Sequence, residues 1–330
     1  MASDVTVKIT LTKGVGELGF GIPLILASKA ESNIAYKEYS NIAELATDYP
    51  NNTEVYKVAT MIWLQDEAPA RIAICSSTKK ATETLDEIYH ENWRQLITVL
   101  GEDDSTASEV STYMETRKDR LYFVAETSAE AVTTNYGTTK PERTVAMVHA
   151  TEPLVHAALV GATAGRDAGS FTYKNIILKG VAPENLTDAK IDEIHLAGGI
   201  AFVTKSGDNV TTEGKSVSGE YVDIVDSKDY IVQQITYKTQ KLLNSMPKIP
   251  YDNTGIAMLE TCVTDVLNDA FGMGIIAVDK ENLPDFSTSY ALRSDVPEGE
   301  RAERKYLGGT FKFGLAGAIH NVEVHGEIIV

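Results

Sequence analysis

Between residues 71 and 204 the chain repeats one arrangement, in which a short apolar run is followed by an amphipathic stretch. The apolar runs recur at about 71–75, 95–100, 121–125, 144–148, 175–178 and 200–204. Residues with helical spacing lie between most of them, at about 78–90, 104–117, 153–164 and 187–196. Continuous apolar strands that alternate with such helices are typical of a mostly parallel sheet with helices on both faces. The pattern therefore predicts an α/β domain, which we place at residues 30–205.

The residues that precede and open this domain predict further strands. Val5–Leu11 alternates apolar and polar residues strictly, which is the period of a strand with one buried face. A glycine-rich turn leads to a second apolar run at Ile22 to Leu26, and a third strand is expected at about 33–38. Two helices then follow, at about 40–48 and 53–65.

Beyond residue 205 the pattern changes from short alternating units to two long helices. In order, the sequence predicts a hairpin or linker at Lys205–Gly219, helices at about 226–245 and 253–271, a loop-rich stretch at 279–304, and strands at 310–313 and 318–330. We expect the first helix to begin at Asp226 or Ser227. This mixture of long helices and strands predicts an α+β part at the C-terminal end of the α/β domain.

Both ends of the sequence predict an apolar strand. The apolar positions are Val5, Val7, Ile9 and Leu11 in the first strand and Ile319, Val322, Val324, Ile328 and Val330 in the last. A hydrophobic strand that stays unpaired is an aggregation site. Its pairing can come from within the chain, or from a neighbouring copy by strand addition. The pattern alone leaves both solutions open.

Charge and the length of the apolar runs exclude several classes of partner. The formal net charge of −17 repels a phosphate backbone, so we expect no nucleic-acid partner. Lys79 and Lys80 are the densest basic pair, which is too small to form a binding patch. No run approaches the ~20 apolar residues of a membrane span, so we expect no membrane insertion. Without an N-terminal signal pattern, the protein is expected in the cytosol when it is made.

One motif favours an enzyme. Gly14, Gly16 and Gly19 match the dinucleotide fingerprint G-x-G-x-x-G and follow a predicted strand. An α/β enzyme that binds a nucleotide at Gly14–Gly19 is therefore the alternative hypothesis. The fingerprint requires a helix that begins at the third glycine. Gly21 and Pro23 interrupt a helix there, and the residues that follow are typical of a strand, so we favour a flexible turn.

The sequence contains no other pattern that indicates catalysis or ligand binding. The six histidines lack metal-ligand spacing. No serine-hydrolase elbow, P-loop or Cys–His signature occurs. The expected carboxyl ends of the strands carry no convergent set of polar residues. We therefore predict no catalytic, cofactor-binding or metal-binding residues, no cofactor and no enzymatic activity.

Three stretches resemble the contractile tail sheath proteins of bacteriophages and of related phage-tail-like particles. The first runs from Ile34 to Ala73 and has the family's order of a strand, two helices and a strand. The second combines Gly169–Lys174 with Leu178–Val181. The third and most specific begins at Gly219-Glu220-Tyr221 and continues to Ile256. Gly314–Val330 is similar to the closing strand region of the family, so the resemblance covers most of the chain.

This resemblance implies a structural subunit whose core is discontinuous. The N-terminal segment joins the C-terminal third, so residues 1–29 would form an N-terminal arm and a strand of the sheath core. Residues 30–205 would be the α/β domain, and 206–330 the C-terminal sheath core domain that ends in a β arm. The arms, at about Val5–Leu11 and Ala318–Val330, are expected to add strands to neighbouring copies.

The resemblance also implies an assembly and its partners. Hexameric rings would stack helically around a tail tube, and contraction would drive the tube through the bacterial envelope. Besides further copies, the implied partners are the tail tube protein and the baseplate and tail terminator proteins. The subunit would assemble in the host cytoplasm and reside in a virion tail or a released phage-tail-like particle. Lys238, Lys241 and Lys248 are candidates for the surface that faces the tube, and pairing with nearby acids is the alternative explanation for them.

Overall fold

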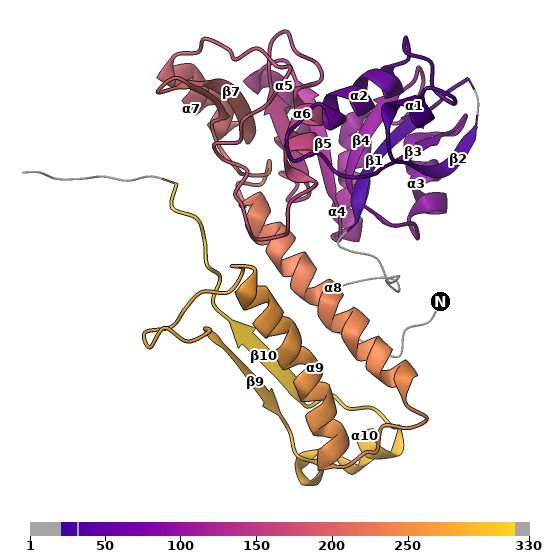
Figure 1. Cartoon of the computed structure of the whole chain (residues 1–330), viewed down its shortest axis with the longest axis vertical. Coiled ribbons are helices and arrows are strands. Elements are labelled where there is room, and N and C mark those ends of the chain that lie inside the picture. The colour runs from indigo at the N-terminus through magenta and orange to yellow at the C-terminus, as the bar shows by residue number, and fades with distance from the viewer. Residues whose placement is uncertain (1–20, 32, 321–330) are drawn as a thin grey trace, which may run out of the picture.

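The computed structural model describes residues 21–31 and 33–320 of the chain. Two lobes are joined by one long helix, α8 (Val222–Ser245), which runs from one lobe into the other (Figure 1). We call residues 21–221 the large lobe and residues 246–313 the small lobe. An eight-stranded sheet lies in the large lobe and a two-stranded sheet in the small lobe. The predicted fold class, a mostly parallel α/β sheet followed by an α+β part, is confirmed.

The large sheet has the strand order β2-β3-β1-β4-β5-β6-β7-β8. The inner strands are parallel, and β2 and β8 run antiparallel at the two edges. The strands are β1 (Ile22–Ser28), β2 (Ile34–Tyr39), β3 (Ile72–Ser76), β4 (Trp93–Leu100), β5 (Leu121–Glu126), β6 (Thr144–Val148), β7 (Gly199–Lys205) and β8 (Asp208–Thr211).

The sheet extends beyond residues 30–205 at both of its ends. Strand β1 lies between β3 and β4, because its apolar residues Leu24, Ile25 and Leu26 need cover on both faces and are fully buried. Strand β8 forms a hairpin with β7 at one edge. Residues 22–28 and 208–211 therefore belong to the same sheet as the predicted α/β domain. The further division of the chain into domains stays a proposal.

Helices cover both faces of the large sheet, as the alternation of apolar runs predicts. Strand residues such as Ile25 face one core, together with α1 (Ile42–Leu45), α2 (Glu54–Trp63) and α6 (Val155–Thr163). Neighbouring residues such as Leu24 face the other core, where the helices are α3 (Ala81–Ile88), α4 (Ala107–Arg117), α5 (Ala129–Tyr136) and α7 (Asp188–Leu196). Each face of the sheet is thus closed by the chain itself.

Three details differ from the sequence-based expectation. Residues 175–178 form no named strand, since Ile177 makes only an isolated bridge to Val210. Helix α5 was not predicted, although Ser128 caps it by accepting a hydrogen bond from the Ala131 N–H. Helix α8 begins at Val222, earlier than Asp226 or Ser227, because Val222 and Val225 are buried on the same face.

The small lobe is built on α8 and α9 (Asn253–Gly272), which pack side by side (Figure 1). Its core combines Ile231 and Ile235 from α8 with Val263, Val266 and Leu267 from α9. The stretch at 279–304 is more ordered than predicted, with β9 (Phe286–Tyr290), the 3-10 helix η1 (Arg293–Asp295) and α10 (Glu298–Ala302). Strand β10 (Gly309–Phe313) completes an antiparallel pair with β9.

Helix α6 lies deep inside the large lobe and every one of its residues is buried. Gly161 permits its close approach to α2, since a Cβ atom there would lie 2.3 Å from the carbonyl oxygen of Ile62. His156 lies on the same helix and is buried. Burial lowers its pKa to about 4. The neutral imidazole is therefore part of the core at neutral pH.

Acid should destabilise the fold through His156. The unfolded histidine titrates near 6.5 and the folded one near 4, so the unfolded chain binds the extra proton between these values. This contribution to the free energy of unfolding is complete above about pH 6.5 and is lost as pH falls toward 4. It amounts to roughly 3 kcal/mol. Urea unfolding from pH 7 to 4.5 should show a weaker pH dependence in His156→Gln than in the wild type.

The matched control is His90→Gln, because the His90 side chain is 64% exposed. It should leave the pH dependence unchanged. Equal pH dependence in His156→Gln and the wild type would contradict the assignment.

Candidate assembly site

The small sheet has two different faces. Phe286 and Tyr290 on β9 and Phe311 and Phe313 on β10 are partly buried against the core of the small lobe. The opposite face carries Ser287 and Ser289 on β9 and Thr310 and Lys312 on β10, and these four residues are exposed. A sheet of only two strands is marginal by itself, so its packing against α9 provides much of its support.

The edges of this sheet are open within the part of the chain that the structure describes. There, neither β9 nor β10 pairs with a third strand. Outward-pointing N–H and C=O groups on an open edge can accept a further strand. A strand whose apolar and polar residues alternate would extend both the aromatic face and the polar face of the pair. The small sheet is therefore suited to strand addition.

The structure places only one of the predicted arm residues. Val5, Val7, Ile9, Leu11, Val322, Val324, Ile328 and Val330 lie outside the described residues. Ile319 is described, and its side chain is 84% exposed. Ala318, Ile319 and His320 belong to no named strand. The strand predicted for 318–330 is thus not seen over its first three residues, and the rest of that prediction is untested.

The three candidate lysines for the tube-facing surface differ in their surroundings. Lys238 Nζ lies 2.6 Å from Asp269 Oδ2 and so joins α8 to α9. Lys241 Nζ lies 3.4 Å from the Tyr237 hydroxyl and is exposed on the same helix. Lys248 is exposed in the loop between α8 and α9. Pairing with an acid therefore accounts for Lys238, and the tube-facing role of Lys241 and Lys248 stays a prediction.

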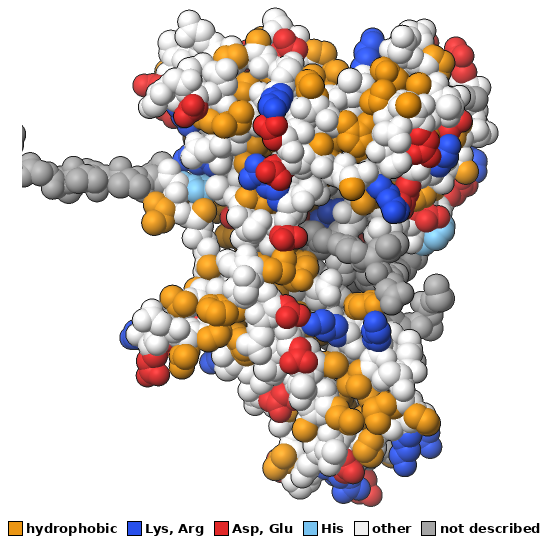
Figure 2. Space-filling model, viewed as in Figure 1, with side chains coloured by type: hydrophobic (Ala, Val, Ile, Leu, Met, Phe, Trp, Pro, Cys, Tyr) orange, Lys and Arg blue, Asp and Glu red, His pale blue; other side chains and the backbone are white. Residues whose placement is uncertain are grey.

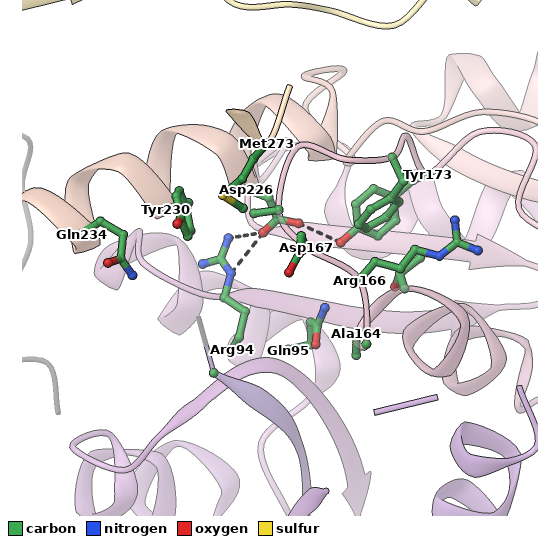
Figure 3. Close-up of a pocket in the computed structure, with 15 residues that line it drawn as sticks. Arg94, Gln95, Ala164, Arg166, Asp167, Tyr173, Asp226, Tyr230, Gln234 and Met273 are labelled. Atoms are coloured by element: carbon green, nitrogen blue, oxygen red, sulfur yellow. Dashed lines mark hydrogen bonds and ion pairs between the residues drawn. The ribbon is translucent and has the colours of Figure 1, made fainter. Parts of the chain in front are cut away.

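A group of buried ion pairs connects the large lobe to α8, and Figure 3 shows the pair between Arg94 and Asp226. Arg94, on β4, donates from Nε to Asp226 Oδ1 at 3.1 Å, and its Nη2 lies 2.8 Å from Asp229 Oδ2. Arg143, which precedes β6, contacts both carboxylate oxygens of Asp229, one of them at 3.2 Å. The Tyr173 hydroxyl donates to Asp226 Oδ2 at 2.8 Å. We call these five residues the junction cluster.

Burial makes the junction cluster sensitive to the loss of any member. The Arg94 side chain is 4% exposed and that of Asp226 is 7% exposed. Burial acts to lower the pKa of Arg94, but the carboxylates of Asp226 and Asp229 outweigh it and raise the pKa above its ordinary value. Burial and the Asp226 carboxylate together raise the pKa of Tyr173. Two cations therefore face two anions, and the tyrosine remains a neutral donor.

A cavity of about 410 Å³ lies beside the junction cluster. Figure 3 shows that Arg94, Asp226 and Tyr173 point toward one another at its wall, so that their charges are already satisfied. Within the described ranges, no three His, Cys, Asp or Glu side chains are arranged to hold a metal ion. No helix in those ranges is long and apolar enough to cross a bilayer.

The glycine motif of the alternative hypothesis, Gly14–Gly19, lies outside the described residues. The element that follows it is nevertheless clear, because β1 begins at Ile22 and is a strand in the middle of the large sheet. A dinucleotide fingerprint needs a helix at that point. The prediction of a strand over Ile22 to Leu26 is confirmed, and it removes the main structural support for nucleotide binding there.

Sequence reasoning missed the junction cluster. Asp226 was expected to start α8, but it lies in the second turn of that helix and is buried. Two signals could have found the cluster. Asp226 and Asp229 are three residues apart and so share a helix face with Val222. Arg94 stands in the apolar strand β4, where a charged side chain requires a partner.

The comparisons with known proteins agree on one family. Residues 222–328 match the model of the C-terminal domain of E217 tail sheath protein gp31-like proteins, which is about a third of the chain. No curated protein matches the chain. The resemblance to contractile tail sheath proteins drawn from the sequence is confirmed by this match together with the structural likeness that follows.

Solved structures share the fold over nearly the whole chain. A chain of the anti-feeding prophage baseplate is 11% identical with a TM-score of 0.74, covering 100% of this chain and 98% of that one. A chain of the contracted helical sheath of the same prophage is 13% identical with a TM-score of 0.68, covering 100% and 99%. The sheath tail protein Lin1278 of Listeria innocua is 11% identical with a TM-score of 0.58, covering 83% and 89%. At these identities the likeness shows a shared fold.

Breaking the junction cluster should cost far more stability than breaking an exposed ion pair. Arg94→Met leaves the buried carboxylate of Asp226 without its partner, which typically costs about 3–5 kcal/mol. Lys190→Met is the control, because Lys190 pairs with Glu193 on the surface of α7 and such pairs contribute under about 1 kcal/mol. Urea unfolding of both variants measures the difference.

A second substitution tests the cause of that loss. Adding Asp226→Asn to Arg94→Met removes the unpaired charge and should restore part of the stability. Equal losses in Arg94→Met and Lys190→Met would contradict a buried Asp226 carboxylate that depends on Arg94.

Proposed function

We propose that this chain is the structural subunit of a contractile tail sheath and has no enzymatic role. Hexameric rings of it would stack helically around a tail tube, and contraction would drive the tube through a bacterial envelope. The match of residues 222–328 to a tail sheath domain and the sheath fold of the whole chain support this function. The observation that carries it is the open two-stranded sheet of the small lobe, in a chain with two alternating terminal segments.

On this proposal the small sheet is completed by neighbouring copies. Val5–Leu11 of one copy and, in another, the part of the predicted strand 318–330 that follows His320 would add to the edges of β9 and β10. Each added strand brings backbone hydrogen bonds, at about 0.5–1.5 kcal/mol apiece, and buries its alternating apolar side chains. A sheet of three or four strands is stable where a pair is marginal. The arms would thus stabilise the two-stranded sheet of each subunit and at the same time form a strong contact between subunits.

The remaining parts of the proposal follow the same assembly. The energy of contraction would come from the metastable extended polymer. The partners would be the tail tube protein together with baseplate and tail terminator proteins. The subunit would assemble in the host cytoplasm and then belong to the tail of a virion or of a phage-tail-like particle. Residues 1–29 would serve as the N-terminal arm and core strand, and 206–330 as the C-terminal sheath core, except that β1 and β8 also complete the large sheet.

Deleting residues 321–330 should abolish polymers and leave a folded monomer. The deletion removes apolar strand positions such as Val322, Val324 and Ile328 that would pair with a neighbour. Negative-stain microscopy reports the polymers, and circular dichroism with urea unfolding reports the fold. The control, Glu323→Gln with Glu327→Gln, keeps the apolar positions and should still polymerise. Unchanged polymers in the truncated protein would sink the proposed role of this arm.

Reversing the charge of the candidate lysines should uncouple the sheath from its tube. The double variant Lys241→Glu, Lys248→Glu is expected to reduce sheath bound to purified tail tubes about tenfold, because charge complementarity governs such contacts. Polymers formed without tubes should persist. The control is Lys57→Glu on α2, where the lysine is paired with Glu54 on the surface of the large lobe. Equal tube binding by both variants would remove these lysines from the tube-facing surface.

A further inference from the structure

The chain crosses back from the small lobe to the large lobe after β10. We call residues 314–320 the strap. Its first part is held by the small lobe, where the Gly314 N–H donates to the Asp285 carbonyl at 2.8 Å and the Ala316 N–H to the Ile275 carbonyl at 2.9 Å. Figure 1 shows this last yellow segment leaving β10 and reaching the level of the large lobe. The strap is therefore a second connection between the lobes, beside α8.

The far end of the strap is seated in the large lobe by His320. Its Nε2 lies 2.9 Å from Thr172 Oγ1, and its carbonyl oxygen accepts a hydrogen bond from Lys174 Nζ at 3.1 Å. Its Nδ1 lies 3.5 Å from Glu213 Oε1, and its ring meets Tyr221 edge to face at 4.8 Å. The His320 side chain is 9% exposed, in contrast to the neighbouring Ile319. The polar residue His320 is thus inserted into the large lobe, whereas the apolar residue Ile319 beside it stays exposed to solvent.

The large lobe places a carboxylate beside the ring of His320. Burial acts to raise the pKa of Glu213, but the Gly214 N–H and the cations of Lys215 and Lys174 outweigh it and lower the pKa. Glu213 is therefore an anion at neutral pH, and it faces Nδ1 of His320. Lys215 stabilises the same group, with Nζ 3.6 Å from Glu213 Oε2 and 4.8 Å from the centre of the Tyr221 ring.

The position of the seat connects it to α8. Tyr221 is the residue that precedes the first turn of α8, so the strap ends where that helix leaves the large lobe. The two connections between the lobes therefore converge on one side of the large lobe. An element tied at both ends has less freedom than one tied at β10 alone.

The geometry points to His320 as the anchor of the C-terminal arm. Thr172 and Lys174 fasten the strap to the large lobe by hydrogen bonds, with Glu213 beside the same ring, so residues 321–330 follow a point on the large lobe and not β10. Their reach toward a neighbouring copy is set by this seat. Only this last step rests on the proposed sheath function, because the seat itself is a property of the single chain.

Amide hydrogen exchange of the full-length monomer tests the anchor. His320→Ala should speed exchange of the hydrogen-bonded Gly314 and Ala316 amides about tenfold, since these bonds open more often once the far end of the strap is released. Ile319→Ala is the matched control, one residue away and exposed, and should leave exchange unchanged. Equal exchange in the two variants overturns the anchor. If His320→Ala does not fold, Thr172→Val and Glu213→Gln replace it, with Asp208→Asn at an exposed position as their control.

Microscopy of the same variants separates the anchor from the proposed function. His320→Ala should form fewer and shorter polymers than Ile319→Ala, because the arm no longer starts from a fixed point. A wild-type protein that never polymerises contradicts the sheath function, while the exchange result still decides the anchor. Polymers that form normally from His320→Ala, with the strap loosened, show that the seat does not guide the arm.

Discussion

The junction cluster is the interaction on which the arrangement of the two lobes depends. Asp226 and Asp229 project from α8 into the large lobe, where Arg94 and Arg143 meet them away from water. A buried ion pair is weak evidence for net stability, since desolvation offsets much of its attraction. The contribution of these ion pairs here is to orient α8 relative to the large lobe. A charged pair admits few geometries, so it fixes the rotation of α8 and therefore the placement of everything that α8 carries.

The sheets of the two lobes differ in how they are covered. The large sheet lies between two layers of helices, and its central strand β1 is buried on both faces. It needs no second chain. The small sheet has one aromatic face against α9 and two edges that no described strand occupies. Over the described residues, one sheet is covered on both faces and the other keeps open edges, which is the feature that the proposed strand addition would use.

The periodicity of apolar residues was enough to predict the strands and helices that depend on local sequence. Runs such as Thr144–Val148 and their intervening helices gave the mostly parallel sheet, because burial on both faces makes such strands continuously apolar. Contacts between residues far apart in the sequence were missed. Asp226 looked like a helix start, since only the folded chain brings Arg94 beside it. The histidine spacing gave no role to His320 for the same reason, as Thr172 and Glu213 lie far away in sequence.

A contractile polymer must change shape without losing its subunits, and the chain separates these two demands. The large lobe keeps its fold by contacts within itself, which need not change. On the proposed function, the contacts between copies lie at strand edges and terminal segments, whose backbone hydrogen bonds would tolerate changes of angle between neighbours. Between these regions lie α8, fixed in direction by the junction cluster, and the strap, fixed in position by His320. On the proposed function, two connections that converge on one lobe would transmit a rotation of that lobe to both the small sheet and the start of residues 321–330. The large lobe would then act as the rigid part that moves during contraction, and the arms as the joints that stay paired.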